Sequence, residues 1–176
     1  MAYVNLLSDD DFTFQSFQLG ASNLVEALVG YNDLEDISYS LRVSLDVMPG
    51  GFEYELRFCI HEYDGSTESD FDYFSAKDVA TKIPGQHKAA TRACLLRGIE
   101  TLITNSRPEK VFLCTVDTYA PLKANRKFIL IAELFEGMGY EVKTADPYNG
   151  QRVWWMTRPG HPEVEPVTSK DKDHGS

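Results

Sequence analysis

Apolar and polar residues alternate strictly between residues 37 and 47. The apolar positions are Ile37, Tyr39, Leu41, Val43, Leu45 and Val47. A period of two predicts a strand with one buried face and one solvent-exposed face. A Pro-Gly-Gly turn at residues 49–51 follows, and a second alternating run extends over residues 52–61. The two runs together predict a β-hairpin, with His61 on its solvent-facing side.

Helical spacing of apolar residues marks three further segments: residues 21–30, residues 86–104, and a stretch that begins near residue 125 and is closed by glycines at 137 and 139. Short apolar segments typical of strands are the phenylalanines Phe12, Phe14 and Phe17, residues 71–74, the continuous run 111–116, and residues 140–144 and 152–157. This order of elements predicts an α+β domain with a mixed, mostly antiparallel central sheet and helices on both faces.

The length of 176 residues suits one domain, and a hydrophobic content of 43% is enough for a sizeable core. We assign residues 1–158 to this domain and expect residues 159–176 to form a disordered acidic tail. No apolar run is long enough for a membrane span and no basic signal-peptide start is present, so we expect a cytoplasmic protein. The three cysteines, Cys59, Cys94 and Cys114, follow no metal or disulfide spacing and are predicted to be core thiols.

The net charge of −10 is unevenly distributed along the chain. Residues 1–78 carry 16 acidic and 3 basic side chains, whereas residues 79–158 carry 7 acidic and 12 basic side chains. The acidic total argues against direct binding to nucleic acid or to an anionic membrane. The basic second half is the part of the chain that could hold an anionic ligand.

From residue 37 to residue 156 the order of predicted elements resembles the GNAT superfamily of N-acyltransferases. The most telling segments are the loop and helix of residues 85–104, the buried strand of residues 111–116, and residues 134–140. The last of these reads LFEGMGY, which is similar to the family's LYEKLGF. The resemblance implies a GNAT-like fold that binds an acyl-CoA, with the pyrophosphate at the start of the long helix, where free backbone N–H groups favour an anion.

The resemblance also implies which residues bind the cofactor, acetyl-CoA or another acyl-CoA. They are Lys82, Gly85, Gln86, His87, Lys88 and, at the next helix, Asn125. Ala89 and Thr91 occupy the family's glycine positions, and Phe135 stands where many members have a tyrosine that protonates the leaving thiolate. Tyr119, in the loop after the buried strand, is the candidate acid in its place.

A general base would have to deprotonate the acceptor amine. His61 and its neighbour Glu62 are the candidates, because imidazole and carboxylate groups accept protons near neutral pH. The alternative for His61 is a solvated side chain at a strand end. If the hairpin turn is centred on residues 49–50, Arg42 and Arg57 lie directly opposite each other and share either an anion or a neighbouring acid.

These features predict transfer of an acyl group from acyl-CoA to an unidentified amine. One alternative is a non-catalytic protein of the same fold, whose acidic first half binds a basic partner as an inhibitor or nucleic-acid mimic does. Another is a GNAT-like enzyme that uses a different activated donor. The sequence contains no metal-binding motif, no Ser-His-Asp arrangement and no Walker loop, so no metal is predicted.

Overall fold

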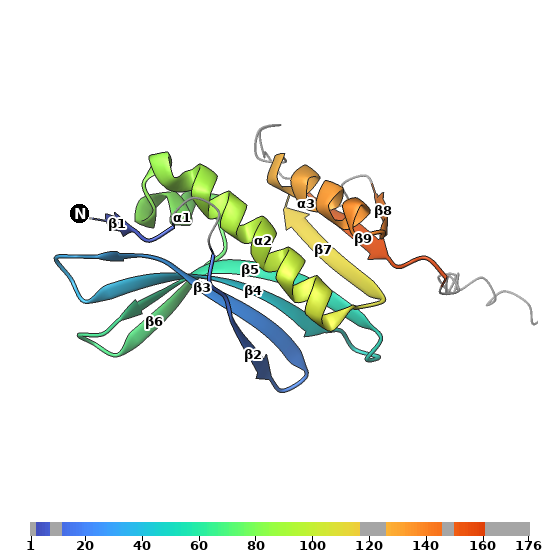
Figure 1. Cartoon of the computed structure of the whole chain (residues 1–176), viewed down its shortest axis with the longest axis horizontal. Coiled ribbons are helices and arrows are strands. Elements are labelled where there is room, and N and C mark those ends of the chain that lie inside the picture. The colour runs from blue at the N-terminus through green and yellow to red at the C-terminus, as the bar shows by residue number, and fades with distance from the viewer. Residues whose placement is uncertain (1–2, 8–11, 117–125, 146–149, 161–176) are drawn as a thin grey trace, which may run out of the picture.

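The computed structural model describes residues 3–7, 12–116, 126–145 and 150–160 (Figure 1). The strands are β1 (Tyr3–Asn5), β2 (Gln15–Leu19), β3 (Ser22–Asn32), β4 (Ile37–Val47), β5 (Glu53–Asp64), β6 (Ser69–Tyr73), β7 (Lys110–Val116), β8 (Glu141–Thr144) and β9 (Gln151–Thr157). The helices are α1 (Ala76–Lys82), the short 3-10 turn η1 (Gly85–His87), α2 (Lys88–Ser106) and α3 (Arg126–Gly137).

All nine strands of the described chain belong to one sheet. Its order is β1-β3-β4-β5-β7-β9-β8, with β2 pairing with β3 and β6 pairing with β5 beside this path. Every strand pair is antiparallel except β5 with β7, which is parallel. The structure therefore confirms the α+β class and the mixed, mostly antiparallel sheet.

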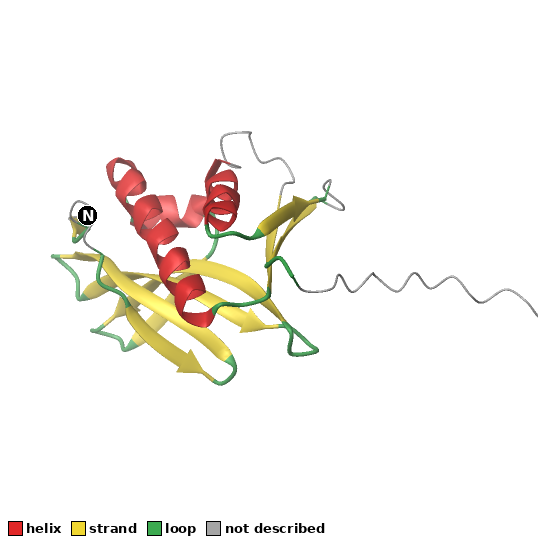
Figure 2. Ribbon diagram, turned by 45° about the vertical axis from the view of Figure 1, so that its right-hand side comes forward, coloured by secondary structure: helices red, strands yellow, loops and turns green. Residues whose placement is uncertain are grey.

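The helices of the described chain lie on one side of this sheet (Figures 1 and 2). Helix α2 contacts β3 and β4, while α3 contacts α2, β8 and β9. The sequence predicted helices on both faces, and the structure differs because the hairpin has only one apolar face. The other face of β4 carries Ser40, Arg42 and Ser44, which offer a helix nothing to pack against.

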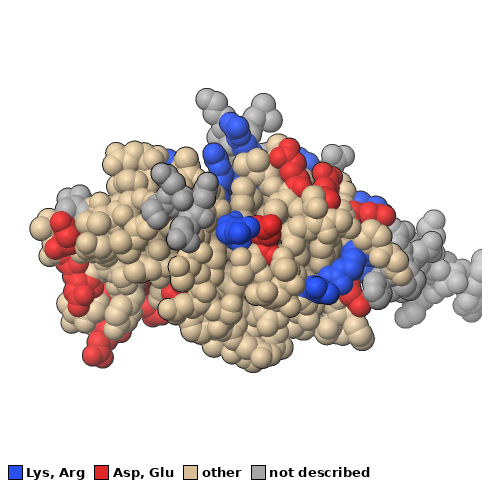
Figure 3. Space-filling view, viewed as in Figure 1, with Lys and Arg blue, Asp and Glu red and all other residues tan. Residues whose placement is uncertain are grey.

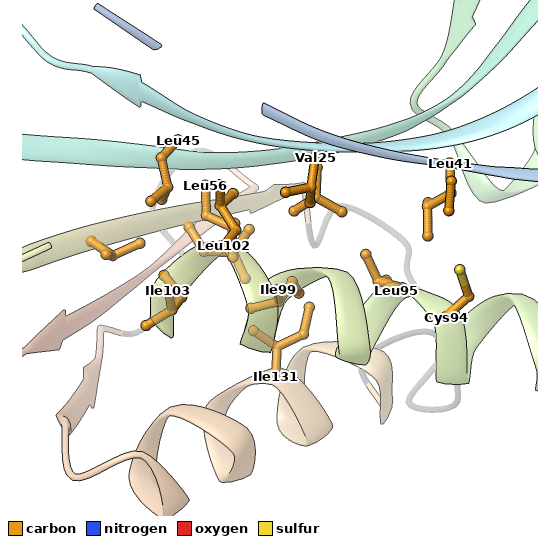
Figure 4. Close-up of a cluster of buried hydrophobic side chains, with 14 of the residues drawn as sticks. Val25, Leu41, Leu45, Leu56, Cys94, Leu95, Ile99, Leu102, Ile103 and Ile131 are labelled. Atoms are coloured by element: carbon orange, nitrogen blue, oxygen red, sulfur yellow. The ribbon is translucent and has the colours of Figure 1, made fainter. Parts of the chain in front are cut away.

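The core lies between this apolar face and the helices. Leu95 and Leu102 of α2 lie against side chains of the sheet such as Val25 and Leu56, and Ile131 reaches α2 from α3 on its other side (Figure 4). Each of these five side chains is at most 6% exposed. Helix α2 is consequently sandwiched between the sheet and α3, which fixes where its first turn lies.

The predicted helix at residues 21–30 is wrong, because these residues form β3. Val25, Ala27 and Val29 alternate as buried positions along it. Leu24 and Leu28 stand at the alternate positions, on the other face of the strand, so apolar residues occur on both faces and also fit a helical spacing. The strand pairs with β4 on one edge and with β1 and β2 on the other, and these partners decide its conformation.

The hairpin of β4 and β5 is confirmed, but its register differs from the one predicted. Residues 48–52 form a longer turn than a two-residue one, closed by a hydrogen bond from the backbone N–H of Met48 to the carbonyl of Glu53. Arg42 consequently lies opposite Cys59, and Arg57 lies opposite Ser44. The expected opposition of Arg42 and Arg57 is therefore wrong.

The strands predicted at 71–74, 111–116, 140–144 and 152–157 are all present within a few residues, as is the long helix.

Cys59 and Cys94 are buried, whereas Cys114 is exposed, which corrects its assignment as a core thiol. Strand β1 and helix α1 were not predicted. Tyr119, Asn125 and the tail from residue 161 lie outside the described residues. Among the described residues, no helix is both long and apolar enough to cross a membrane.

Candidate functional site

The parallel strands β5 and β7 meet at only one end. They pair over residues 53–55 and 110–112, and β7 then diverges from β5 (Figure 1). On the same edge of β5, pairing with β6 begins only at Ile60. Residues 56–59 therefore have no strand partner on that edge within the described chain. Backbone N–H and C=O groups on this edge are available to a ligand, because such groups need hydrogen-bond partners.

A pocket of about 240 Å³ opens beside this free edge. Its apolar walls come from β4, β5, α1 and α2 and include Leu41, Ile60, Val79, Ile83 and Leu95. Three cations, Lys88, Arg92 and Lys127, also line it, and no acidic side chain does so among the described residues. The combination of apolar walls and cationic groups suits a ligand that has both an apolar part and a negative charge.

The segment between β6 and α2 builds one wall of the pocket. Ser75 caps α1 by accepting a hydrogen bond from the backbone N–H of Asp78 at 3.1 Å. Ile83, at the end of α1, is only 1% exposed and anchors this segment in the core. Tyr73 and Ala76 line the pocket from the same segment.

The start of α2 is electropositive. Its N-cap residue, His87, makes no side-chain capping hydrogen bond, and the first turn contains no acidic residue. The unsatisfied N–H groups of a helix start favour an anion, and the cationic Lys88 is the first residue of the helix. Both Lys88 and Arg92 belong to the pocket lining, so this positive end faces the same cavity.

Lys127 is an unusual lysine because it is held among aromatic rings. Its Nζ lies 4.9 Å from the centroid of the Phe58 ring and 4.8 Å from that of Phe128. Burial lowers the pKa of Lys127 below the usual value for lysine. No salt bridge to Lys127 is present among the described residues. A cation kept in a costly environment without an acidic partner is a candidate ligand contact.

Glu62 lies on the pocket side of β5, one hydrogen bond away from the lining residue Tyr73. The hydroxyl of Tyr73 donates to its Oε1 at 3.2 Å, and Lys82 Nζ lies 2.8 Å from its Oε2. The contact with Lys82 is an ion pair rather than a well-aligned hydrogen bond. Burial acts to lower the pKa of Lys82, but its contacts with Glu62 and Tyr73 outweigh burial and raise the pKa. Burial, together with Glu62, raises the pKa of Tyr39 to about 12.

His61 lies on the opposite face of the sheet and is not a solvated side chain. It is only 6% exposed, and its Nδ1 lies 2.9 Å from Asp72 Oδ1 and 2.8 Å from Arg42 Nη1. Nδ1 can accept a hydrogen bond from Arg42 or donate one to Asp72, but it cannot do both at once. Arg42 also pairs with Glu26 at 3.1 Å. The solvated alternative for His61 is therefore wrong, because β6 and β4 supply partners that a single strand pattern does not reveal.

The structure brings only part of the predicted cofactor set to the pocket. Lys88 lines it, and Gly85, Gln86 and His87 form η1 immediately before that residue. The centroid of the His87 ring lies 5.4 Å from the centroid of the Tyr3 ring. Lys82 is instead paired with Glu62. Asn125 and the candidate acid Tyr119 lie outside the described residues.

Sequence reasoning did not identify the apolar half of the pocket. Val79 and Ala76 line it from α1, a helix of only seven residues, and Phe58 lines it from β5. Lys127 belongs to the basic segment around Asn125 in the sequence, but nothing in the sequence shows that it is half-buried against the ring of Phe58. For the cationic side of the pocket the sequence did contain a signal, because residues 79–99 include no acidic residue.

The acidic first half of the chain is partly neutralised within the fold. Glu26, Glu53 and Glu62 each pair with a basic residue, and Arg57 contacts both Asp46 and Glu55. In Figure 3, acidic side chains gather at the left end of the view, where the loops after β3 and β5 lie, and basic side chains stand at its top. The charge division of the sequence is therefore visible on the surface, but several strand acids are internally paired.

Comparison with known proteins gives no match to a protein-family model, to a curated protein or to a solved structure. Within the described ranges, no group of three or more His, Cys, Asp or Glu side chains is placed to hold a metal ion. The function must be argued from the pocket itself.

Proposed function

We propose that this protein is an acyl-CoA-dependent N-acyltransferase and that its pocket binds the acyl-CoA. The observation that carries the proposal is an apolar pocket that opens along an unpaired strand edge and has Lys88, Arg92 and Lys127 in its lining. Acyl-CoA combines phosphates, an arm with two amide groups, and an apolar acyl group. The cations suit the phosphates, the unpaired strand edge suits the amide-containing arm, and the apolar walls suit the acyl group.

The free edge of β5 suits the amide-containing arm of CoA. Within residues 56–59, alternate residues direct their backbone N–H and C=O groups toward the missing partner strand. An extended chain with amide groups can pair with such an edge as an added strand does. Lys88, Arg92 and the first turn of α2 then provide cations and free N–H groups for the phosphates.

Transfer would consist of attack by the amine nitrogen on the thioester carbonyl carbon. The C–N bond forms as the C–S bond breaks, the nitrogen loses a proton, and the leaving thiolate takes one up. Holding both reactants in place supplies much of the rate enhancement in such a reaction. Of the two predicted bases, Glu62 is on the pocket side of the sheet, whereas His61 is on the other side. Glu62 or a water molecule held through Tyr73 is therefore the proposed proton acceptor.

Lys88→Glu is expected to weaken the binding of acetyl-CoA at least about tenfold, because a charge-assisted contact with phosphate contributes about 1.5–3 kcal/mol. Isothermal titration calorimetry with the purified full chain measures this effect. Lys77→Glu is the matched control, since Lys77 is exposed on α1 and does not line the pocket. It changes the net charge by the same amount and should bind like the wild type.

Equal weakening by the two variants would mean that only the overall charge matters, and it would count against a phosphate site at α2. The absence of any binding by acetyl-CoA, CoA or longer acyl-CoA to the wild type would overturn the proposal. Binding of acyl-CoA without acyl transfer to any of a panel of amines would favour the non-catalytic alternative on the same fold.

A further inference from the structure

The apolar part of the pocket is larger than an acetyl group needs. The whole pocket, including the space beside its three cations, has a volume of about 240 Å³, which is equivalent to at most roughly eight groups the size of a water or methylene, at roughly 30 Å³ each. Its walls include Leu41, Ile60 and Ile83, which are each at most 3% exposed. The pocket therefore borders the hydrophobic core as well as the strand edge.

The chemistry of these walls excludes most polar occupants. The lining also includes Val79, Leu95 and the rings of Phe58 and Tyr73. A polar group placed among such side chains would lose its hydrogen bonds to water without replacement. The amide-bearing arm of CoA is better accommodated at the free backbone edge of β5, which leaves the apolar interior for the acyl chain itself.

From this we infer that the pocket selects a medium-length aliphatic acyl group of up to about eight carbons, so that the preferred donor is a medium-chain acyl-CoA rather than acetyl-CoA. This inference rests on the proposed function. The α1 wall would set the chain length, because Ala76 and Val79 stand on the side of the pocket formed by that helix. Chains much longer than eight carbons would exceed the volume.

Calorimetric titration of the full chain with CoA, acetyl-CoA, octanoyl-CoA and palmitoyl-CoA tests the inference. Each fully buried methylene strengthens binding roughly fourfold, so partial burial of six added methylenes predicts octanoyl-CoA to bind at least about 30-fold more tightly than acetyl-CoA. Palmitoyl-CoA should gain nothing further over octanoyl-CoA.

Ala76→Trp should fill the part of the pocket next to α1 and thereby remove the preference for octanoyl-CoA over acetyl-CoA. Ala76 is exposed at the start of α1, so the change does not disturb the core. Ala80→Trp is the matched control, because Ala80 is exposed on the same helix and does not line the pocket. It should keep the full preference.

The failures of the two proposals are distinguishable. If CoA and acetyl-CoA bind and octanoyl-CoA binds no more tightly than acetyl-CoA, the acyl-chain inference is overturned and the proposed function stands. If no CoA compound binds, the proposed function itself fails. If free octanoate binds and CoA does not, the pocket takes a fatty acid and the assignment of a thioester is overturned.

Discussion

Lys82→Met is expected to lower the free energy of unfolding by about 3 kcal/mol, because it leaves the carboxylate of Glu62 buried without its cation. The side chain of Glu62 is only 8% exposed, and the ion pair with Lys82 joins the end of α1 to β5. Tyr73 retains its hydrogen bond to Glu62, so part of the site stays intact. Urea denaturation at pH 7 measures the loss.

Two variants separate this effect from simple loss of packing. Removing both charges with Glu62→Gln and Lys82→Met should restore most of the lost stability, because no unpaired charge then remains. Lys77→Met, on the exposed side of the same helix, should change stability by less than about 0.5 kcal/mol. A Lys82→Met protein as stable as the wild type would show that Glu62 is not held by this ion pair.

Lys127→Met is expected to weaken acyl-CoA binding about tenfold or more while it makes the folded protein more stable. Burial lowers the pKa of Lys127 in the folded state, so its charged form is penalised on folding at neutral pH. Methionine keeps the contact with Phe58 and Phe128 without that penalty. The variant should therefore unfold at a higher urea concentration and yet lose a cation that a phosphate would use.

Because the charge of Lys127 depends on pH, acyl-CoA binding should depend on pH as well. Burial lowers the folded-state pKa of Lys127, so this side chain loses its charge at a lower pH than it would in an unfolded chain. Acyl-CoA affinity should fall as the pH rises through that value, and Lys127→Met should remove this part of the decline. Arg126→Met is the control, because Arg126 is exposed and does not line the pocket. If Lys127→Met lowers stability and leaves binding unchanged, Lys127 is a structural residue.

Patterns confined to one segment predicted the fold best. The strict alternation of β4 and β5, the apolar run of β7 and the apolar stripe of α2 each depend on burial along a single element. Strand β3 could not be recognised, because Leu24 and Leu28 on its other face mask the alternation that marks a strand. Its conformation is decided by partners on both edges, which the local pattern does not contain.

In the candidate site, too, features of one segment could be predicted and features that depend on tertiary partners could not. The cationic start of α2 follows from residues that are adjacent in the sequence, such as Lys88 and Arg92. The partners of His61 do not, because they lie on β4 and β6 and depend on register. The pocket walls likewise come from separate elements of the chain, with Leu41 on β4, Leu95 on α2 and Lys127 on α3. Only tertiary packing brings such residues together.

Hydrogen–deuterium exchange of the full chain with and without CoA tests most directly whether the pocket beside β5 is the acyl-CoA site. Bound CoA should slow the exchange of backbone amides within residues 56–59, whose strand edge is otherwise unpaired, and within the first turn of α2 at residues 88–92. Amides of β8, at the far edge of the sheet, should be unaffected. Saturating CoA that leaves residues 56–59 and 88–92 unchanged, or that protects a different surface, would contradict the assignment.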